Sequence, residues 1–278
     1  MNSPATHNLV IGQPPSVSAC SRLYAQDGFR KALVILLLAL AWEAYARWLN
    51  NPLLFPTLTE TLKALFSGVL SGEIPRAAWF TLKLLLKGYF IGLLLAAILT
   101  GLANSTRIGA DFLETLTAMF NPLPSIALLP LALIWFGLGD GSVIFVLVHA
   151  VLWAVALNTY AGFRSVSPTW KMVGQNYGLS NFAYIVRILI PGAFPSILTG
   201  LKVGWAFAWR TLIAAELVFG TSSGAGGLGW YIFENKNQLS IPNVFAGLLT
   251  VILFGLFVDN VVFKSIENRT VRKWGMQS

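Results

Sequence analysis

Six apolar blocks, each long enough to cross a lipid bilayer as one helix, determine what this chain can fold into. A transmembrane helix needs about 20 mostly apolar residues. Inside a bilayer only helices and closed barrels satisfy their backbone hydrogen bonds, and these blocks are too long and too weakly alternating for barrel strands. The sequence therefore predicts an all-α polytopic membrane protein with six transmembrane helices, at residues 32–49, 79–102, 112–137, 142–163, 193–219 and 244–263.

The composition supports a membrane protein and argues against an enzyme. Only 11% of the 278 residues are charged and 56% are hydrophobic, whereas a soluble domain has about 25% charged residues. Ten Trp and seven Tyr suit two aromatic belts at the membrane interfaces. The single cysteine, Cys20, excludes an internal disulfide, and two His with scattered acids provide no metal-ligand cluster or nucleophile–base pair. We therefore expect no catalytic residue, no cofactor and no metal site.

The basic residues predict the orientation of the chain. With the N-terminus in the cytoplasm most of them fall on the inner side, as positive-inside topology requires. We then expect cytoplasmic tails at 1–31 and 268–278, and a transmembrane domain at 32–267 with a cytoplasmic loop at about 164–192. The net charge of +8 suits topology and anionic headgroups rather than nucleic acid. The inner set is Arg22, Arg30, Lys31, Arg107, Arg164, Lys171, Arg187, Lys202, Lys264, Arg269, Arg272 and Lys273, and the outer set is Arg47, Lys63, Arg76 and Lys236.

The loop between the fourth and fifth spans carries the most specific motif. Gly178 is followed by Ile188, and Pro191 ends an Ile-x-aliphatic-Pro run. This spacing resembles the coupling loop of permease subunits of bacterial ABC importers, which opens with Glu-Ala-Ala; Met172-Val173-Gly174 stands there instead. The resemblance implies a helix near 167–181 that docks on a separate ATPase, with Gly178 in a tight turn that a side chain would obstruct. The implied coupling residues are Gly174, Tyr177, Gly178, Leu179, Ser180, Ile188 and Pro191.

Three prolines interrupt the third span. Each proline removes a backbone donor and tends to kink or break a helix. Released carbonyls persist at membrane depth only against protein or a water-filled cavity, so broken helices are typical of transport pathways. A packing kink is the alternative for any single proline. The segment that begins Asn121-Pro122-Leu123-Pro124-Ser125 and ends in Trp135-Phe136-Gly137 closely resembles permeases of nitrate, bicarbonate, taurine and sulfonate importers.

The fifth span combines small and charged residues. Gly200, Gly204 and Ala208 recur every fourth position, which lets a helix pack closely, either within one subunit or across a two-fold axis. Arg210 and Glu216 are about 120° apart around the helix, so they do not form a simple i,i+4 pair. A charge inside a membrane faces a bundle interior or a cavity. Arg210 either donates to the oxygens of a passing anion or pairs with a polar group on another helix, such as Glu216 of another subunit.

The segment from Trp209 to Glu216 also resembles oxyanion and organosulfonate permeases. The whole resemblance implies the type I, MetI-like permease fold in the bacterial inner membrane. It further implies a homodimer or a heterodimer with a related permease, a cytoplasmic ATPase pair that alone hydrolyses ATP, and an external solute-binding protein. The implied cargo is a small anion: nitrate, bicarbonate, taurine, another sulfonate or an aromatic carboxylate. The expected path residues are Arg210, Trp209, Glu216, Pro124 and Ser125.

An ion-gradient-driven secondary transporter is the main alternative. It would need intramembrane carboxylates and usually internal repeats, and uptake without ATP would favour it. Between the spans, Thr57 or Thr59 is expected to cap a short interfacial helix. The glycine-rich segment 220–229 is expected to be a flexible outer loop, since it lacks the features of a nucleotide loop. His149 in the fourth span is expected to be a core histidine with satisfied hydrogen bonds.

Overall fold

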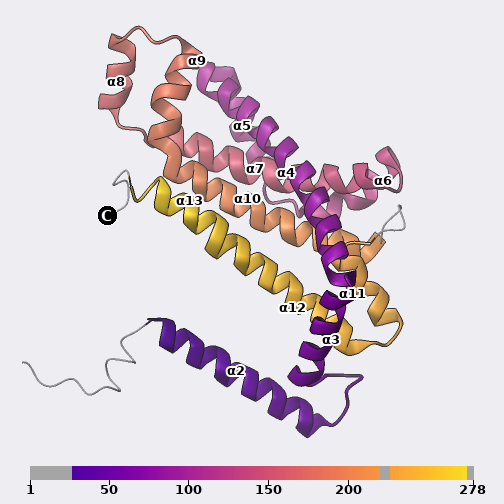
Figure 1. Ribbon diagram of the computed structural model, residues 1–278. Helices are drawn as coiled ribbons and strands as arrows, with labels where there is room; N and C mark the ends of the chain where they lie inside the picture. Colours follow the sequence, from indigo (N-terminus) through magenta and orange to yellow (C-terminus); the bar gives the residue numbers. More distant parts are fainter. Residues whose placement is uncertain (1–26, 220–225, 274–278) are drawn as a thin grey trace, which may run out of the picture. The chain divides into compact units, whose positions relative to one another are not determined.

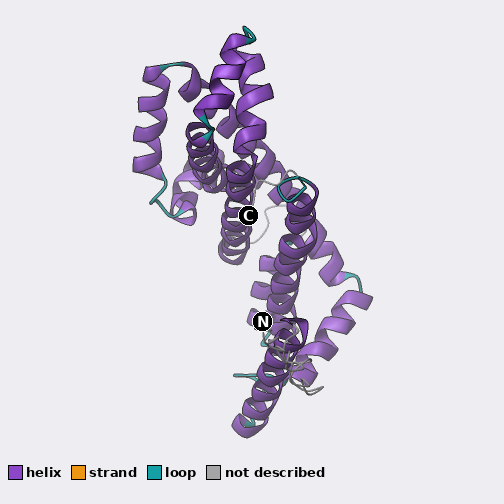
Figure 2. Ribbon diagram, turned by 90° about the vertical axis from the view of Figure 1, so that its left-hand side faces the viewer, coloured by secondary structure: helices purple, strands orange, loops and turns teal. Residues whose placement is uncertain are grey.

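The computed structural model describes residues 27–219 and 226–273, and these residues form helices, turns and loops with no strand (Figure 2). The all-α prediction is therefore confirmed. Cys20, the glycines at 220–225, most of the predicted N-terminal tail and residues 274–278 of the predicted C-terminal tail lie outside the described residues. The chain divides into two units, Met1–Asn51 and Pro52–Ser278. The described helix of the first unit is α2 (Asp27–Leu49), which is apolar and long enough to cross a membrane.

The second unit contains the remaining helices (Figure 1). Its long helices run between two ends, with the short helices α8 and α9 at one end and α11 at the other. The elements are α3 (Leu58–Leu70), α4 (Glu73–Ser105), α5 (Arg107–Phe120), the 3-10 turn η1 (Ser125–Leu128), α6 (Leu129–Phe136), α7 (Asp140–Ser165), α8 (Pro168–Asn176), α9 (Asn181–Tyr184), the π-helical turn η2 (Ile185–Leu189), α10 (Ile190–Phe219), α11 (Leu228–Asn237), α12 (Ile241–Phe257), the π-helical turn η3 (Val258–Phe263) and α13 (Lys264–Arg269).

Across the described residues five helices can cross a membrane by length and hydropathy, and a bent pair makes up to six. The bent pair is α5 with η1 and α6, which meet at 88° across residues 121–124. Pro124 precedes η1, and Pro130 occupies the first turn of α6, where its missing N–H has no helical acceptor to lose. The third predicted span is therefore a broken helix rather than a continuous one, as its prolines indicated.

Close packing of α7 against α10 and α4 forms the core of the second unit. A Cβ on Gly88 of α4 would lie 2.6 Å from the Cβ of Leu147, so only glycine permits this approach. On the other side, a Cβ on Gly200 would lie 2.8 Å from the Cβ of Asn158, and Gly204 lies against Val155. The small-residue face of the fifth span therefore packs against α7 of the same chain, which decides between the two alternatives that the sequence left open.

Two short helices illustrate a confirmed and a wrong prediction. Thr57 caps α3 as expected: its hydroxyl accepts from the Glu60 N–H at 3.1 Å, and the Glu60 carboxylate accepts from the Thr57 N–H at 2.9 Å. This reciprocal capping box satisfies two backbone donors that the helix leaves open. By contrast, part of the predicted flexible segment 220–229 belongs to the helix α11, whose first residues are buried.

Candidate translocation pocket and coupling segment

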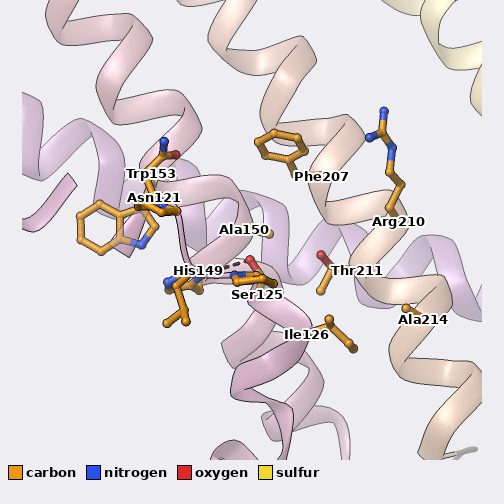
Figure 3. A pocket seen from close by; sticks show the side chains of 13 residues that line it. Asn121, Ser125, Ile126, His149, Ala150, Trp153, Phe207, Arg210, Thr211 and Ala214 are labelled. Atoms are coloured by element: carbon orange, nitrogen blue, oxygen red, sulfur yellow. Dashed lines mark hydrogen bonds between the residues drawn. The ribbon is translucent and has the colours of Figure 1, made fainter. Parts of the chain in front are cut away.

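A cavity of about 380 Å³, here called the break cavity, lies where the third span is interrupted (Figure 3). Its walls come from the end of α5, the turn that follows, η1, α7 and α10. The break itself creates this space, because the 88° bend turns α6 away from the line of α5. The polar lining side chains are Asn121, Ser125, His149, Trp153, Arg210 and Thr211, with Pro124 and Phe207 among the apolar ones.

Hydrogen-bond donors dominate the polar lining, and no carboxylate lies among the lining residues of this cavity. The Ser125 hydroxyl lies 3.0 Å from Nδ1 of His149, which ties η1 to α7. The guanidinium of Arg210 adds a positive charge at the rim. An anion is therefore the ligand that this lining suits best.

Arg210 lies at the edge of the break cavity beside Phe207, on a face of α10 that the described part of the chain leaves exposed. It forms no hydrogen bond or ion pair with any described residue. Of the two surroundings expected for a charge in this span, a bundle interior or a cavity, Arg210 has the cavity. The side chain is accessible to cargo or to whatever covers this face of α10.

The structure separates the expected path residues. Pro124, Ser125 and Arg210 line the break cavity, whereas Trp209 and Glu216 do not. Trp209 is buried and stacks on Phe254, with ring centroids 4.9 Å apart. Trp209 and Arg210 face different surroundings because neighbouring residues lie about 100° apart around α10.

Glu216 is buried in a polar cluster that joins α4, α10 and α11, here called the Glu216 cluster. Its carboxylate oxygens lie 2.9 and 3.0 Å from the donating hydroxyl of Thr81, and the Gly229 N–H donates to it at 2.8 Å. The Thr81 hydroxyl also accepts from the Leu228 N–H at 2.8 Å. A Cβ on Gly227 would lie 2.1 Å from Oε1 of Glu216, so glycine is needed for this approach. A carboxylate at the start of α11 also complements the helix dipole.

A second cavity of about 320 Å³, here called the seam cavity, lies between α5 and α7. It shares Asn121 and Pro122 with the break cavity. Glu114 lies at its edge and accepts from the Arg164 guanidinium at 3.1 Å. Since Arg164 is near the end of α7, the seam cavity leads from the helix break toward the coupling loop.

The predicted coupling helix corresponds to α8, and Gly178 ends it. The Gly178 φ angle is +63°, and the Leu179 N–H donates to the Gly174 carbonyl at 3.2 Å. This left-handed turn with its six-residue hydrogen bond is a Schellman motif. No atom lies within 4 Å of a Cβ built on Gly178. The tight turn is thus confirmed, but the expected obstruction is wrong: the backbone angle, rather than lack of space, favours glycine.

Gly174, the last residue of the triplet Met172-Val173-Gly174, lies at a close contact between helices. A Cβ there would lie 2.8 Å from Cδ2 of Tyr184 and 3.1 Å from Cγ1 of Ile188. The glycine therefore lets α8 pack directly on α9 and η2. Ile188 also contacts a small core around Phe163. The backbone carbonyl of Ser180, which precedes α9, accepts from the N–H of Tyr184, the last residue of that helix.

Large apolar side chains remain exposed along the same segment. Trp170 is 60% exposed, Tyr177 is 81% exposed and Phe182 is 78% exposed. Pro191 is exposed at the start of α10. Exposed aromatic residues on and beside α8 are typical of a protein–protein contact surface.

Sequence reasoning missed several polar residues of the two cavities. His149 was expected to be satisfied, but its Nε2 atom is buried without a partner among the described residues. Asn121 and Thr211 were not singled out as lining residues. A polar residue inside an apolar span was the available signal in each case. What was missing was the rotation of each helix about its axis.

Comparison with known proteins adds a family. A family described as "binding-protein-dependent transport system inner membrane component" matches residues 88–270, which is more than half of the chain. The chain is 30% identical to the taurine transport system permease protein of Escherichia coli, over 80% of this chain and 82% of the relative. It is 26% identical to the nitrate import permease protein of Synechocystis sp., over 87% of this chain and 89% of the relative.

Proposed function

Because the chain belongs to the family of inner membrane components of binding-protein-dependent transport systems, we propose that it forms the membrane path for a small anion in an ATP-driven importer. Its fold is the MetI-like permease fold of ABC importers, and the protein is a transport permease. We further propose the class of anion, the path it takes and the coupling to an ATPase.

The lining of the break cavity is the observation that supports an anion as the cargo. Asn121 and Thr211 place donors in the cavity wall, where Ser125 bonds His149, Arg210 stands at the cavity edge, and no acid is among the lining residues. A guanidinium offers a planar fork of donors that matches the oxygens of nitrate, a sulfonate or a carboxylate. Two relatives are named for taurine, which carries a sulfonate, and for nitrate. The cargo we propose is therefore nitrate, bicarbonate, taurine, another sulfonate or an aromatic carboxylate.

The coupling segment supports a separate cytoplasmic ATPase pair as the source of energy. The exposed aromatic residues of 170–182 provide an apolar surface on which such a partner can dock. Gly174, Tyr177, Gly178, Leu179, Ser180, Ile188 and Pro191 all lie in this segment or at its junction with α10. Movement of α8 would pass to the spans through its packing on Tyr184 and Ile188.

A second copy of the chain and an external solute-binding protein complete the proposed importer. The exposed face of α10 at Phe207 and Arg210 supports a second permease that closes the break cavity from that side. The positive-inside bias supports a cytoplasmic position for both termini and for α8 in the bacterial inner membrane. The binding protein would then meet the opposite end, near α11.

The test is uptake by the permease reconstituted with its ATPase and binding protein, with nitrate, taurine and methanesulfonate as probes. Arg210→Lys keeps the charge but loses the fork, and Arg210→Gln loses both. We expect both variants to assemble with the ATPase and to import at least tenfold more slowly, a change of about 1.4 kcal/mol in the barrier. Lys63→Gln, an exposed change on α3, is the matched control for loss of one charge.

The outcomes decide the role of Arg210 and the energy source of transport. Normal import by both Arg210 variants would remove Arg210 from the path. Failure of both to assemble would make Arg210 a structural residue. Uptake that continues without ATP would favour the ion-gradient-driven alternative over an ATP-driven importer.

A further inference from the structure

Three buried side-chain polar atoms lack a hydrogen-bond partner within the parts of the chain that the structure describes, and all three lie on one seam. They are Oγ1 of Thr117 on α5, and Nε2 of His149 and Nε1 of Trp153 on α7. Buried polar groups in native proteins are nearly always hydrogen-bonded, so each exception needs an explanation. The clustering of all three at one helix contact makes a shared explanation the natural one.

Aromatic packing places two of these groups side by side. His149 and Trp153 are one turn apart on α7, with ring centroids separated by 6.1 Å. Phe120 of α5 stacks on Trp153 at 5.4 Å with an interplanar angle of 11°. Stacking covers the face of the indole, whereas the indole N–H points out in the plane of the ring. Phe120 therefore shields Trp153 without providing the acceptor that its N–H needs.

The hydrogen bond between Ser125 and His149 allows the Nε2 atom of His149 to act as a donor. When the Ser125 hydroxyl donates to Nδ1, at 3.0 Å, the neutral ring carries its proton on Nε2 and becomes a donor. Trp153 can only donate, and Thr117 carries a hydroxyl that can donate. The three groups then form a set of donors that calls for a ligand rich in acceptor oxygens.

The three donor residues are divided between the two cavities. His149 and Trp153 line the break cavity, and Thr117 lines the seam cavity. Asn121 and Pro122 line both cavities, so the three donors lie on residues that border two adjoining cavities.

We propose that Thr117, His149 and Trp153 form a row of donors that binds the oxygen atoms of an oxyanion as it moves from the break cavity into the seam cavity. This inference rests on the proposed function, and it extends the path beyond Arg210. An oxyanion such as nitrate or a sulfonate has acceptor oxygens on several sides, so it can leave one donor while it engages the next. The break cavity offers a cation no carboxylate, and the carboxylate that lines the seam cavity, that of Glu114, is paired with Arg164 at 3.1 Å.

The rival occupant is a structural water that the three groups hold permanently. The two cases differ in the sign of their effect on stability. Removing a donor that has no permanent partner leaves the folded state as stable as before or more stable. Removing a donor that holds a permanent water breaks a hydrogen-bond network and lowers stability.

The test uses two variants in the reconstituted importer. Thr117→Val removes the hydroxyl while keeping its volume, and Trp153→Phe removes the indole N–H together with one ring of a buried side chain. We expect an unchanged or higher melting temperature for Thr117→Val, whereas the cavity left by Trp153→Phe should lower it. We expect uptake of nitrate, taurine or methanesulfonate, whichever the unmodified complex imports, to fall about tenfold, which corresponds to about 1.4 kcal/mol.

Two matched controls separate the donors from general effects of substitution. Thr100 is a buried threonine on α4 whose hydroxyl donates to the Ala96 carbonyl at 2.7 Å. Thr100→Val should therefore lower the melting temperature and leave the uptake rate within about twofold. Trp135 on α6 is exposed and lies outside both cavities, so Trp135→Phe should change neither quantity.

The outcomes separate this inference from the proposed function. If the unmodified complex imports one of the probes and Trp153→Phe and Thr117→Val import it equally fast, the row of donors is refuted and the importer stands. A fall in the melting temperature of Thr117→Val like that of Thr100→Val would also refute it, in favour of permanently bound water. If the unmodified complex imports none of the three anions with ATP, the anion path and the row of donors fail together.

Discussion

Replacement of Thr81 by valine is the sharpest test of the Glu216 cluster. The Thr81 hydroxyl is fully buried, and it donates to the Glu216 carboxylate while it accepts from the Leu228 N–H. Valine keeps the shape of threonine and removes both hydrogen bonds. A buried carboxylate and a buried backbone N–H at the start of α11 are then each left with one partner fewer.

The expected cost follows from those two losses. A hydrogen bond to a charged group contributes about 1.5–3 kcal/mol. A buried N–H left without an acceptor costs about 1–3 kcal/mol. Together they predict a destabilisation of about 2.5–6 kcal/mol for Thr81→Val, whereas Thr81→Ser keeps the hydroxyl and loses one methyl group, at about 1 kcal/mol.

Thermal unfolding of the detergent-purified chain measures this difference, with its ten tryptophans as the intrinsic probe. In a Glu216→Leu background, Thr81→Val should cost at least 1 kcal/mol less than it does alone, because the carboxylate that needed the hydroxyl is absent. Equal melting temperatures for Thr81→Val and Thr81→Ser would refute the reasoning. Additive effects of Thr81→Val and Glu216→Leu would show that the two side chains do not interact.

The remaining predictions concern three glycines, two at close helix contacts and one in a left-handed turn. Gly174→Leu should drive α8 away from Tyr184, leave the spans folded and reduce uptake or ATPase binding at least tenfold, as a pull-down with the ATPase would show. Gly178→Asn should retain coupling, since asparagine tolerates the left-handed angle, whereas Gly178→Val should destabilise the loop by about 1–2 kcal/mol and lower the ratio of transport to ATP hydrolysis. Gly200→Leu should force α10 off Asn158 and lower the melting temperature of the chain, and an unchanged value would contradict the close packing.

Local sequence signals predicted much of the fold. The apolar blocks became helices that can cross a membrane, because their length and hydropathy leave the backbone little other choice in lipid. Thr57 predicted the start of α3, and the prolines around Asn121 predicted the break, because both act within one helical turn. Gly178 likewise predicted its turn, since glycine adopts a left-handed angle at little cost.

Local signals failed where the outcome depended on distant residues. The segment at 226–229 reads as a loop by its glycines, yet those glycines let the start of α11 approach Glu216. The sequence left open whether Arg210 faces a bundle interior or a cavity, and the rotation of α10 places it at the edge of the break cavity. Neither result depends on the residues nearest in sequence.

The sequence by itself determined that this protein crosses the membrane as helices, where the third span breaks, and which loop resembles a coupling loop. Only the tertiary structure decided that Glu216 bonds Thr81, 135 residues earlier, and that Arg210, Ser125 and His149 meet around one cavity. The physical reason is that hydropathy and backbone preferences act over a few residues. The partner of a polar side chain depends on how each helix is rotated and packed against the others, which close contacts such as that of Gly88 with Leu147 fix only in the assembled fold.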